Sequence, residues 1–347
     1  MKINIRLCLM LLAVVGMGCV AQAQHSVILD DDCSNDVDCV LTMPILFEMQ
    51  HRGDVKVLAV MADSANPLTA PVFRIFAKQA GYPEMPIGAN QTNEPSTALS
   101  VSNKSNESLW TKGLIARFAP SDNRTKYPDC ASLYRKTLVA VKDHSVAIAA
   151  TGFPTCLNQL LATKADKISA LSGADLVKQK VSLLSVMGGK YPSGKEWNFT
   201  SDAPGWNALF TMWTKQHGFP PVYLNGFANG AHVIAAPTAG ADPMTSPTQY
   251  ALDLYHTTKR PMWDILSVMY AAWGAQHDGK MWFTVSKAGT VKVDAATGLS
   301  TWNAAANSGH FTITNAQSND AFSALLDART HHGLLWEAEQ RALKPTP

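Results

Sequence analysis

The chain has 347 residues, of which 29 are basic and 27 are acidic, and 46% of its residues are hydrophobic. This near-balance of charge excludes the strong attraction that binding to nucleic-acid backbones or anionic membranes would require. The length and hydrophobic content are sufficient for a large buried core, formed by one big α/β domain or by two closely joined parts.

Residues 1–23 have the pattern of a secretory signal peptide. Lys2 and Arg6 give a positive n-region, Leu7 to Val15 is an apolar h-region, and Ala21-Gln22-Ala23 matches a cleavage site. We therefore expect a periplasmic or secreted protein that is cleaved near Ala23, with residues 24–347 as the mature chain. Loss of the signal peptide leaves 27 basic and 27 acidic residues. No later apolar run is long enough to cross a bilayer, so no membrane span is predicted.

The cysteines leave several alternatives open. Cys19 allows a lipoprotein as an alternative to simple cleavage. An exported compartment permits disulfides among the cysteines that remain, and four cysteines allow three full pairings, between which the sequence does not choose. No C-x-x-C motif occurs, so no zinc site is expected. The remaining cysteines are Cys33, Cys39, Cys130 and Cys156.

A strand, an acidic loop and a helix are predicted for Ser26 to Met49. Val27 to Leu29 is a short apolar run typical of a buried strand, and Val40 to Met49 has the apolar spacing of a helix. In an α/β protein this loop lies at the carboxyl end of a strand, where open parallel sheets bind ligands. The loop contains five aspartates in nine residues: Asp30, Asp31, Asp32, Asp36 and Asp38.

So dense a group of acids favours a metal or catalytic site. Mutual repulsion makes the cluster costly unless a cation is bound or the pKa values are raised. Closely spaced oxygen ligands suit a hard cation such as Ca²⁺ or Mg²⁺. The alternative is a solvated turn with a helix N-cap, but that would explain one or two acids better than five.

The segment Asp30 to Cys39, DDDCSNDVDC, resembles the opening motif of the inosine/uridine-preferring nucleoside hydrolases. It is most similar to an exported branch with the pattern D-T-D-x-G-N-D-x-D-D. Ser34 stands where Gly is usual, and Cys39 stands where the last Asp is usual. The resemblance implies a Ca²⁺-dependent N-ribohydrolase that cleaves the N-glycosidic bond of a nucleoside or a related ribosyl compound.

Further apolar strands, most of them followed by a polar turn and a helix, predict an α/β fold. We expect a mostly parallel, Rossmann-like open sheet flanked by helices. Alternation around Gly289 and Gly298, within Trp282 to Trp302, predicts a small antiparallel hairpin addition near the C-terminus. Residues 90–129 are expected to be loops with one helix at Leu109 to Phe118. The later strands are predicted at Val55–Met61, Pro86–Gly88, Val146–Ala150, Val181–Val186 and Pro221–Asn225.

Two turns after predicted strands resemble the family's site segments. Asn66 would face the ribose, and the alternative is a turn Asn before Pro67. Thr155 lies in a segment similar to the family's G-P-L-T-N-L, where the Thr lends a backbone carbonyl to the calcium ion. The alternative for Thr155 is a helix cap.

Two later segments extend the resemblance. Glu196-Trp197-Asn198 follows an M-G-G turn, as in the family, where the Glu and Asn bind the ribose hydroxyls. Lys190 stands where some members carry Asn. Arg260-Pro261-Met262-Trp263-Asp264 is similar to R-P-S-W-D, in which the Asp is the distal calcium ligand. Trp263 replaces the His that nucleoside-specific members use to protonate the leaving base.

The resemblance assigns a role to each candidate residue. Asp32 would be the general base, close to both the ion and the attacking water. Cys39 is a poor calcium ligand, so Asp38 or Asp36 would fill its place unless the site binds metal weakly. The Ca²⁺ ligands are predicted to be Asp32, Asp38, Thr155 and Asp264. The substrate is predicted to contact Asp36, Asn66, Glu196, Trp197 and Asn198.

Two other classes of protein stay open at this point. One is a non-catalytic exported protein that binds a nucleoside or sugar through a degenerate metal loop. The other is a phosphatase of the haloacid-dehalogenase type, since Asp30-x-Asp32 after an apolar strand matches its first motif. That class needs a late G-D-x-x-x-D element, which the sequence lacks. The expected partner is a small ribosyl molecule, and a homo-oligomer is left open.

Overall fold

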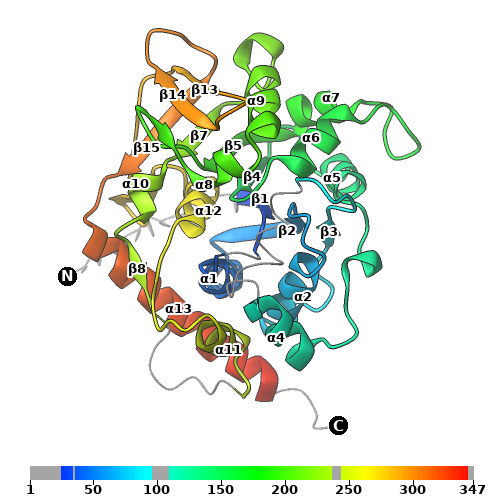
Figure 1. Cartoon of the computed structure of the whole chain (residues 1–347), viewed down its shortest axis with the longest axis vertical. Helices are drawn as coiled ribbons and strands as arrows, with labels where there is room; N and C mark the ends of the chain where they lie inside the picture. The colour runs from blue at the N-terminus through cyan, green and yellow to red at the C-terminus, as the bar shows by residue number, and fades with distance from the viewer. Residues whose placement is uncertain (1–24, 34–35, 96–108, 237–243, 343–347) are drawn as a thin grey trace, which may run out of the picture.

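The computed structural model describes residues 25–33, 36–95, 109–236 and 244–342, so the predicted signal peptide lies outside the described residues. A large sheet forms the centre of the molecule (Figure 1). Its eight strands lie in the order β12 (Phe283–Val285), β15 (His310–Asn315), β7 (Val222–Asn225), β5 (Val181–Met187), β4 (Val146–Ala150), β1 (His25–Asp31), β2 (Val55–Ala62) and β3 (Ile87–Ala89).

The sheet is parallel except at one edge, where β12 runs antiparallel to β15. The predicted α/β fold with a mostly parallel sheet is therefore confirmed. Asp31 pairs with Ala62 of β2, and Asp30 pairs with Ala150 of β4. The acidic run thus begins at the sheet edge where its neighbouring strands also end, which is the usual place for a ligand site.

Helices cover both faces of the sheet, which explains why its strands are almost continuously apolar (Figure 1). Val27 and Leu29 belong to the core shared with α1, α2 and α12, whereas Ile28 faces the core shared with α5, α6 and α9. The described helices are α1 (Cys39–Arg52), α2 (Thr69–Gln79), α4 (Leu109–Phe118), α5 (Cys130–Val139), α6 (Thr155–Ala162), α7 (Gly173–Lys180), α8 (Trp197–Ser201), α9 (Ala203–Met212), α10 (Phe227–Gly230), α11 (Pro247–Leu254), α12 (Asp264–Trp273) and α13 (Asn319–Ala342), with 3-10 turns at Arg124–Lys126 and Lys215–His217.

The C-terminal addition is larger than the sequence indicated. The predicted hairpin is present as β13 (Thr290–Val293) and β14 (Leu299–Asn303), with Gly298 at φ 68° before β14. However, β12 and β15 on either side join the central sheet, because β15 pairs with β7. The remaining small strands are β6 (Ser193–Lys195), which extends the hairpin, β8 (Ile234–Ala235) with β9 (Arg260–Pro261), and β10 (Gln276–His277) with β11 (Lys280–Met281).

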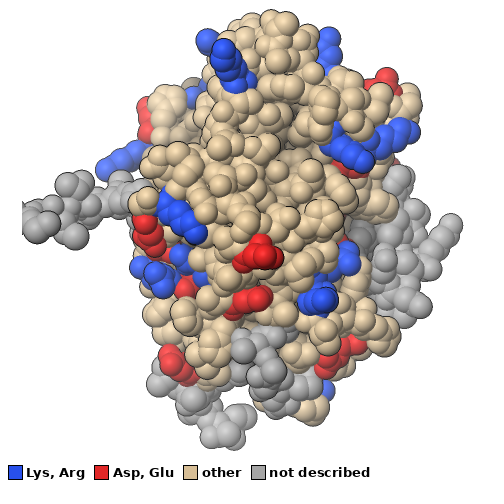
Figure 2. Space-filling view, turned by 90° about the vertical axis from the view of Figure 1, so that its left-hand side faces the viewer, with Lys and Arg blue, Asp and Glu red and all other residues tan. Residues whose placement is uncertain are grey.

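The described charged side chains form no large patch of one sign on the face shown in Figure 2. On the face in Figure 2, acidic and basic side chains are interspersed among uncharged ones, as the near-neutral composition predicts. None of the helices in the described part of the chain is long and apolar enough to span a membrane.

The long helix α13 is held against α1 by a buried ion cluster. Arg329 Nη1 donates to Glu48 Oε2 at 2.7 Å and to Asp54 Oδ2 at 2.8 Å. Arg329 is 5% exposed and Glu48 is 2% exposed. Removing the Arg329 cation would take away the closest partner of the buried Glu48 carboxylate, which is much more costly than losing a surface ion pair.

We expect Arg329→Met to lower the free energy of unfolding by about 3 kcal/mol, measured by urea denaturation. Arg52→Met is the matched control, because Arg52 lies 3.7 Å from the same two acids but its side chain is 47% exposed. It should cost less than about 1 kcal/mol. Equal losses for the two variants would show that the buried cluster does not fix α13.

Candidate active site

The first two acids of the run are anchored in the protein interior. Asp30 Oδ2 accepts a hydrogen bond from the Tyr134 hydroxyl at 2.7 Å. Asp31 accepts from the Thr151 hydroxyl at 2.7 Å and from the backbone N–H of Cys33 at 2.8 Å. Burial raises the pKa of Asp30 to about 8 and also raises that of Asp31. Burial therefore disfavours the charged form of both side chains in the absence of a cation.

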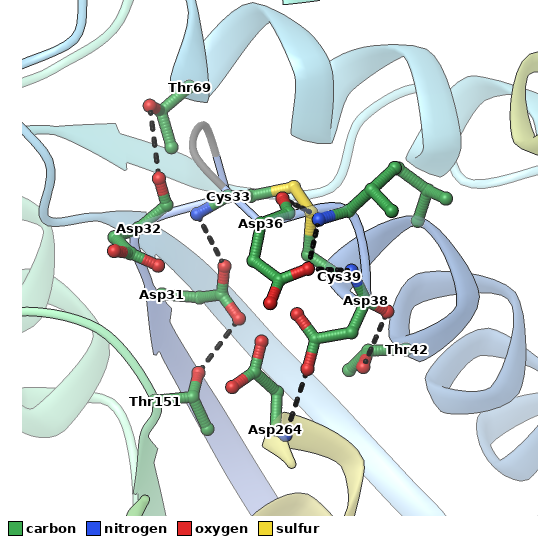
Figure 3. Close-up of a disulfide and its surroundings, with 12 residues drawn as sticks. Asp31, Asp32, Cys33, Asp36, Asp38, Cys39, Thr42, Thr69, Thr151 and Asp264 are labelled. Atoms are coloured by element: carbon green, nitrogen blue, oxygen red, sulfur yellow. Dashed lines mark hydrogen bonds between the residues drawn. A yellow bond between two sulfur atoms is a disulfide. The ribbon is translucent and has the colours of Figure 1, made fainter. Parts of the chain in front are cut away.

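A disulfide between Cys33 and Cys39 closes the acidic loop (Figure 3). Its Cα atoms are 5.5 Å apart, and it joins the end of β1 to the first residue of α1. The sequence left the pairing of the four cysteines open, and the structure shows that Cys39 pairs with Cys33. A disulfide sulfur does not supply the charged oxygen that calcium prefers, so Cys39 leaves no ligand in place of the usual Asp. The described Cys130 and Cys156 are free and buried.

Asp38 connects the acidic loop to the beginning of α12. Its Oδ2 accepts hydrogen bonds from the backbone N–H groups of Trp263 at 3.2 Å and Asp264 at 3.5 Å. Burial raises the pKa of Asp38 to about 8, and repulsion from Asp36 acts in the same direction. Burial and the nearby Asp38 also raise the pKa of Asp264 well above its usual range. Figure 3 shows the side chains of Asp31, Asp36, Asp38 and Asp264 pointing toward one another.

Asp36, a predicted substrate ligand, is held by an arginine far away in the sequence. Its Oδ1 and Oδ2 accept hydrogen bonds from Arg260 Nε at 2.7 Å and Nη2 at 2.6 Å. The guanidinium also lies 5.4 Å from the Tyr255 ring centre and 5.8 Å from that of Trp263. Asp36 therefore lies at the rim in a bidentate ion pair, and its predicted contact with the sugar stays a prediction.

The Glu196–Asn198 segment is fixed by hydrogen bonds to the ends of β4 and β5. Glu196 caps α8, with Oε1 accepting from the N–H of Asn198 and Oε2 from the N–H groups of Gly189 and Phe199. Asn198 Nδ2 donates to the carbonyl oxygens of Thr151 at 2.9 Å and Met187 at 3.2 Å. Burial raises the pKa of Glu196, and the three N–H donors oppose this shift. Glu196 is 6% exposed, so its carboxyl group is buried and is not a solvated loop acid.

Seven of the predicted site residues line a single cavity. This cavity opens to solvent, and its empty volume including that open space is about 510 Å³. Burial, together with repulsion from Asp31 and Asp38, raises the pKa of Asp32 well above its usual range. The cavity is lined by Asp32, Asp36, Asp38, Thr151, Met187, Glu196, Trp197, Asn198, Phe227, Trp263 and Asp264.

Asn66 and Thr155 are not among the residues that line this cavity. Asn66 is 5% exposed, and its Oδ1 accepts from the N–H of Leu68 at 3.0 Å, as expected for a turn residue before Pro67. Thr155 is the first residue of α6, and its buried hydroxyl has no hydrogen-bond partner. Thr151, four residues earlier at the end of β4, lines the cavity instead. The roles predicted for Asn66 and Thr155 thus stay predictions.

Two aromatic side chains complete the wall of the cavity. Phe227 and Trp263 stack with ring centres 5.5 Å apart, and Trp263 Nε1 donates to the Phe227 carbonyl oxygen at 3.0 Å. The resemblance placed Trp263 where nucleoside-specific members carry a His, whereas Phe227 was not among the predicted site residues. Both residues are aromatic and line the same cavity as the exposed Trp197, and an aromatic surface of this kind can stack on a flat ligand. Their aromatic side chains were the feature of the sequence that could have indicated this role.

The chemistry of these acids suits a hard cation, although their arrangement is incomplete. Asp32, Asp38 and Asp264 supply carboxylate oxygens to one cavity, and burial together with mutual repulsion raises their pKa values. Within residues 25–33, 36–95, 109–236 and 244–342, no three His, Cys, Asp or Glu side chains are arranged as a ready metal site. A cation would therefore have to draw the carboxylates together.

Comparisons with known proteins identify the fold. No protein-family model matches the sequence, and no curated protein shows significant sequence similarity to it. A purine-preferring ribonucleoside hydrolase from Gardnerella vaginalis superposes with a TM-score of 0.61 at 14% identity, covering 90% of this chain and 99% of that one. The plant nucleoside hydrolase PpNRh1 superposes with a TM-score of 0.59 at 13% identity, covering 88% and 98%. The chain has a nucleoside hydrolase-like fold.

The same nucleoside hydrolase-like fold occurs in a protein described as an effector. The type III effector XopQ, solved with adenosine diphosphate ribose, has a TM-score of 0.64 and 17% identity, covering 90% of this chain and 95% of that one. At such identities the likeness establishes the fold, so the activity must be argued from the site.

Proposed function

We propose that this protein is an N-ribohydrolase that cleaves the N-glycosidic bond of a nucleoside or a related ribosyl compound. The main support is that distant segments of the chain converge on one cavity, which contains Asp32, Glu196, Asn198 and Asp264. The nucleoside hydrolase-like fold adds support. So does XopQ, whose solved ligand, adenosine diphosphate ribose, is itself a ribosyl compound.

In the proposed reaction, water adds to the anomeric carbon as the bond to the base nitrogen breaks. The transition state carries positive charge on the sugar, which the carboxylates of the cavity would stabilise. Asp32 would accept the proton of the attacking water, and burial together with repulsion from Asp31 raises its pKa, which makes its carboxylate a stronger base. The base leaves with the bonding electrons and takes up a proton, so the products are free sugar and free base.

The remaining cavity residues would orient the substrate. Asn198 uses Nδ2 to donate to two backbone carbonyls, so its Oδ1 would accept from a ribose hydroxyl. Trp197 and Phe227 are 50% and 40% exposed, and with Trp263 they would stack on the leaving base. None of the described cavity residues is a histidine, so we propose that the base receives its proton from water.

Ca²⁺ dependence is part of the proposal. Asp32, Asp38 and Asp264 would supply carboxylates, and Thr155 would supply a backbone carbonyl. When bound, the ion would contribute positive charge and lower the pKa of water. Because Cys39 is in a disulfide and Thr155 is not among the cavity residues, we expect weaker binding than a full set of oxygen ligands would give.

The decisive experiment measures free ribose released from a panel of purine and pyrimidine nucleosides. The mature chain is assayed with Ca²⁺, and again after EDTA treatment followed by Ca²⁺ or Mg²⁺ addition. We expect release that EDTA abolishes and Ca²⁺ restores. Absence of release from every nucleoside would overturn the assignment of nucleosides as substrates, whereas release that is insensitive to EDTA would overturn only the metal requirement.

The raised pKa values predict how stability depends on pH in the metal-free protein. Asp38 has a folded pKa of about 8 against an ordinary value of 3.8, so folding favours its protonated form. The stabilisation that comes from this bound proton is complete below the pKa of Asp38 in the unfolded chain. It is lost as the pH rises toward and through the pKa of Asp38 in the folded protein. The free energy of unfolding in EDTA should fall between pH 6 and pH 8, by about 1.4 kcal/mol per pH unit for each retained proton.

Urea unfolding at the two pH values tests this prediction. Ca²⁺ should stabilise the protein more at pH 8 than at pH 6, because it competes with protons for the same oxygens. Asp38→Asn should reduce the slope of the free energy of unfolding against pH by the amount that corresponds to about one proton. Stability that increases from pH 6 to pH 8 in EDTA would contradict the assignment of protonated carboxyl groups to the folded state.

A second candidate function is non-catalytic binding of a nucleoside or sugar. The specific observation in its favour is the Cys33–Cys39 disulfide, which occupies a position where a calcium carboxylate is usual in the family that the sequence resembles. Calorimetry on the same nucleosides separates the two functions. Binding of a nucleoside without ribose release, at every Ca²⁺ concentration, would favour the binding protein.

A further inference from the structure

We propose that the cavity continues into an anion subsite formed by Lys190 and Lys195, and that the ligand carries a phosphate group attached to its ribose. This inference rests on the proposed function for the ribose position. It adds a chemical class: phosphorylated ribosides, either monophosphates or diphosphates, in preference to uncharged nucleosides.

The first observation is continuity of the two hollows. A second hollow, with an empty volume of about 610 Å³ including open solvent, adjoins the catalytic cavity. The two share the wall residues Glu196, Trp197 and Phe227. A ligand whose sugar lies against Glu196 can therefore extend into the second hollow without leaving the protein surface. This hollow also contains both lysines and Thr200.

The second observation is that the lysine ammonium groups are available. Lys190 and Lys195 are both exposed, and within the described residues neither forms an ion pair with a carboxylate. Asp294 is near enough to Lys195 for that charge to help lower its pKa, but its carboxylate already accepts hydrogen bonds from Thr297. Glu196 faces the same hollow, and its oxygens accept from backbone N–H groups.

The third observation is that the backbone carrying the lysines is held in place. The N–H of Lys190 donates to Ser300 Oγ at 3.0 Å, and the Ser300 hydroxyl donates to the Gly194 carbonyl at 2.9 Å. Ser300 is fully buried. Lys195 ends β6, where it pairs with Leu299 of β14. The two cations thus project from one anchored loop beside the cavity.

Charge complementarity then defines the ligand. The cavity is lined by the acids Asp32, Asp38 and Asp264, which offer no cation to a phosphate and suit a sugar that develops positive charge. The adjoining hollow carries two unpaired cations and would attract an anion. A phosphorylated riboside matches this division, with its sugar over the carboxylates and its phosphate beside the lysines.

The test compares ligands with and without phosphate by calorimetry on the mature chain. Adenosine, AMP, ADP-ribose and inorganic phosphate are titrated at low and moderate salt. Ribose and ribose 5-phosphate repeat the comparison without an N-glycosidic bond to hydrolyse. We expect AMP to bind about tenfold more tightly than adenosine, with a preference that weakens as salt rises. Comparison of AMP with ADP-ribose shows whether the subsite favours a monophosphate or a diphosphate.

The double variant Lys190→Gln/Lys195→Gln should bring the AMP-to-adenosine affinity ratio close to 1. Lys142→Gln is the matched control, because Lys142 is an exposed lysine next to the amino end of β4, whereas the cavity lies at its carboxyl end. Equal wild-type affinities for AMP and adenosine, no measurable binding of any phosphorylated riboside, or an equal loss in the control would overturn the subsite. A lysine-dependent preference for AMP over adenosine, without ribose release, would support the anion subsite and reject the hydrolase function. Ribose release without that preference would support the hydrolase function and reject the subsite.

Discussion

Replacing Asp32 by Asn lowers kcat/KM for nucleoside hydrolysis by about 10³-fold or more, without unfolding the protein. The physical reason is that Asp32 would take the proton of the attacking water. The same change removes an ionisable group from a crowded cluster of acids, where burial and repulsion raise the pKa of Asp32. The free energy of unfolding in EDTA should therefore stay equal or rise, in contrast to an ordinary buried substitution.

Ribose release and urea denaturation, measured on the same preparation, check both parts of this prediction. Asp143→Asn is the control, because Asp143 is an exposed acid paired with Lys180, outside the residues that line the cavity. It should leave both activity and the free energy of unfolding nearly unchanged. A folded Asp32→Asn protein with near-normal turnover would show that another group is the base.

Replacing Cys39 by Asp lowers the free energy of unfolding by about 4 kcal/mol or more and does not tighten Ca²⁺ binding. Loss of a disulfide that spans six positions removes about 2 kcal/mol. The new carboxylate would replace a side chain that is 1% exposed, close to several acids, which adds a further desolvation and repulsion cost.

Cys39→Ser separates the two contributions, because it breaks the disulfide without adding a charge. Melting temperature and calorimetric Ca²⁺ affinity should be measured for the natural protein and for both variants. We expect the order of stability to be natural protein, then Cys39→Ser, then Cys39→Asp. Tighter Ca²⁺ binding by Cys39→Asp than by Cys39→Ser would show that the Cys39 position can still serve as a ligand position.

Much of the fold could be predicted from the sequence because burial leaves a local pattern. The apolar run Val146–Ala150 has the same bounds as β4, and Leu109–Phe118 has those of α4. Strands buried on both faces are continuously apolar, so each was recognisable from its own residues. The same logic placed the acidic run at the carboxyl edge of the sheet. It also identified seven residues that line the cavity.

Only the tertiary structure decided which distant residues meet. The pairing of Cys33 with Cys39 was one of several alternatives, and the ion pair of Asp36 with Arg260 joins residues 224 positions apart. The order of strands in the sheet brings β15 beside β7, although local alternation had suggested only a hairpin in the preceding segment. Periodicity records whether a side chain is buried, whereas the identity of its neighbours depends on how the strands are ordered and the helices packed. For that reason the sequence by itself determined the apolar strands and the acidic motif. Packing determined the Cys33–Cys39 disulfide, the Asp36–Arg260 ion pair at the rim of the cavity, and which of the predicted residues line that cavity.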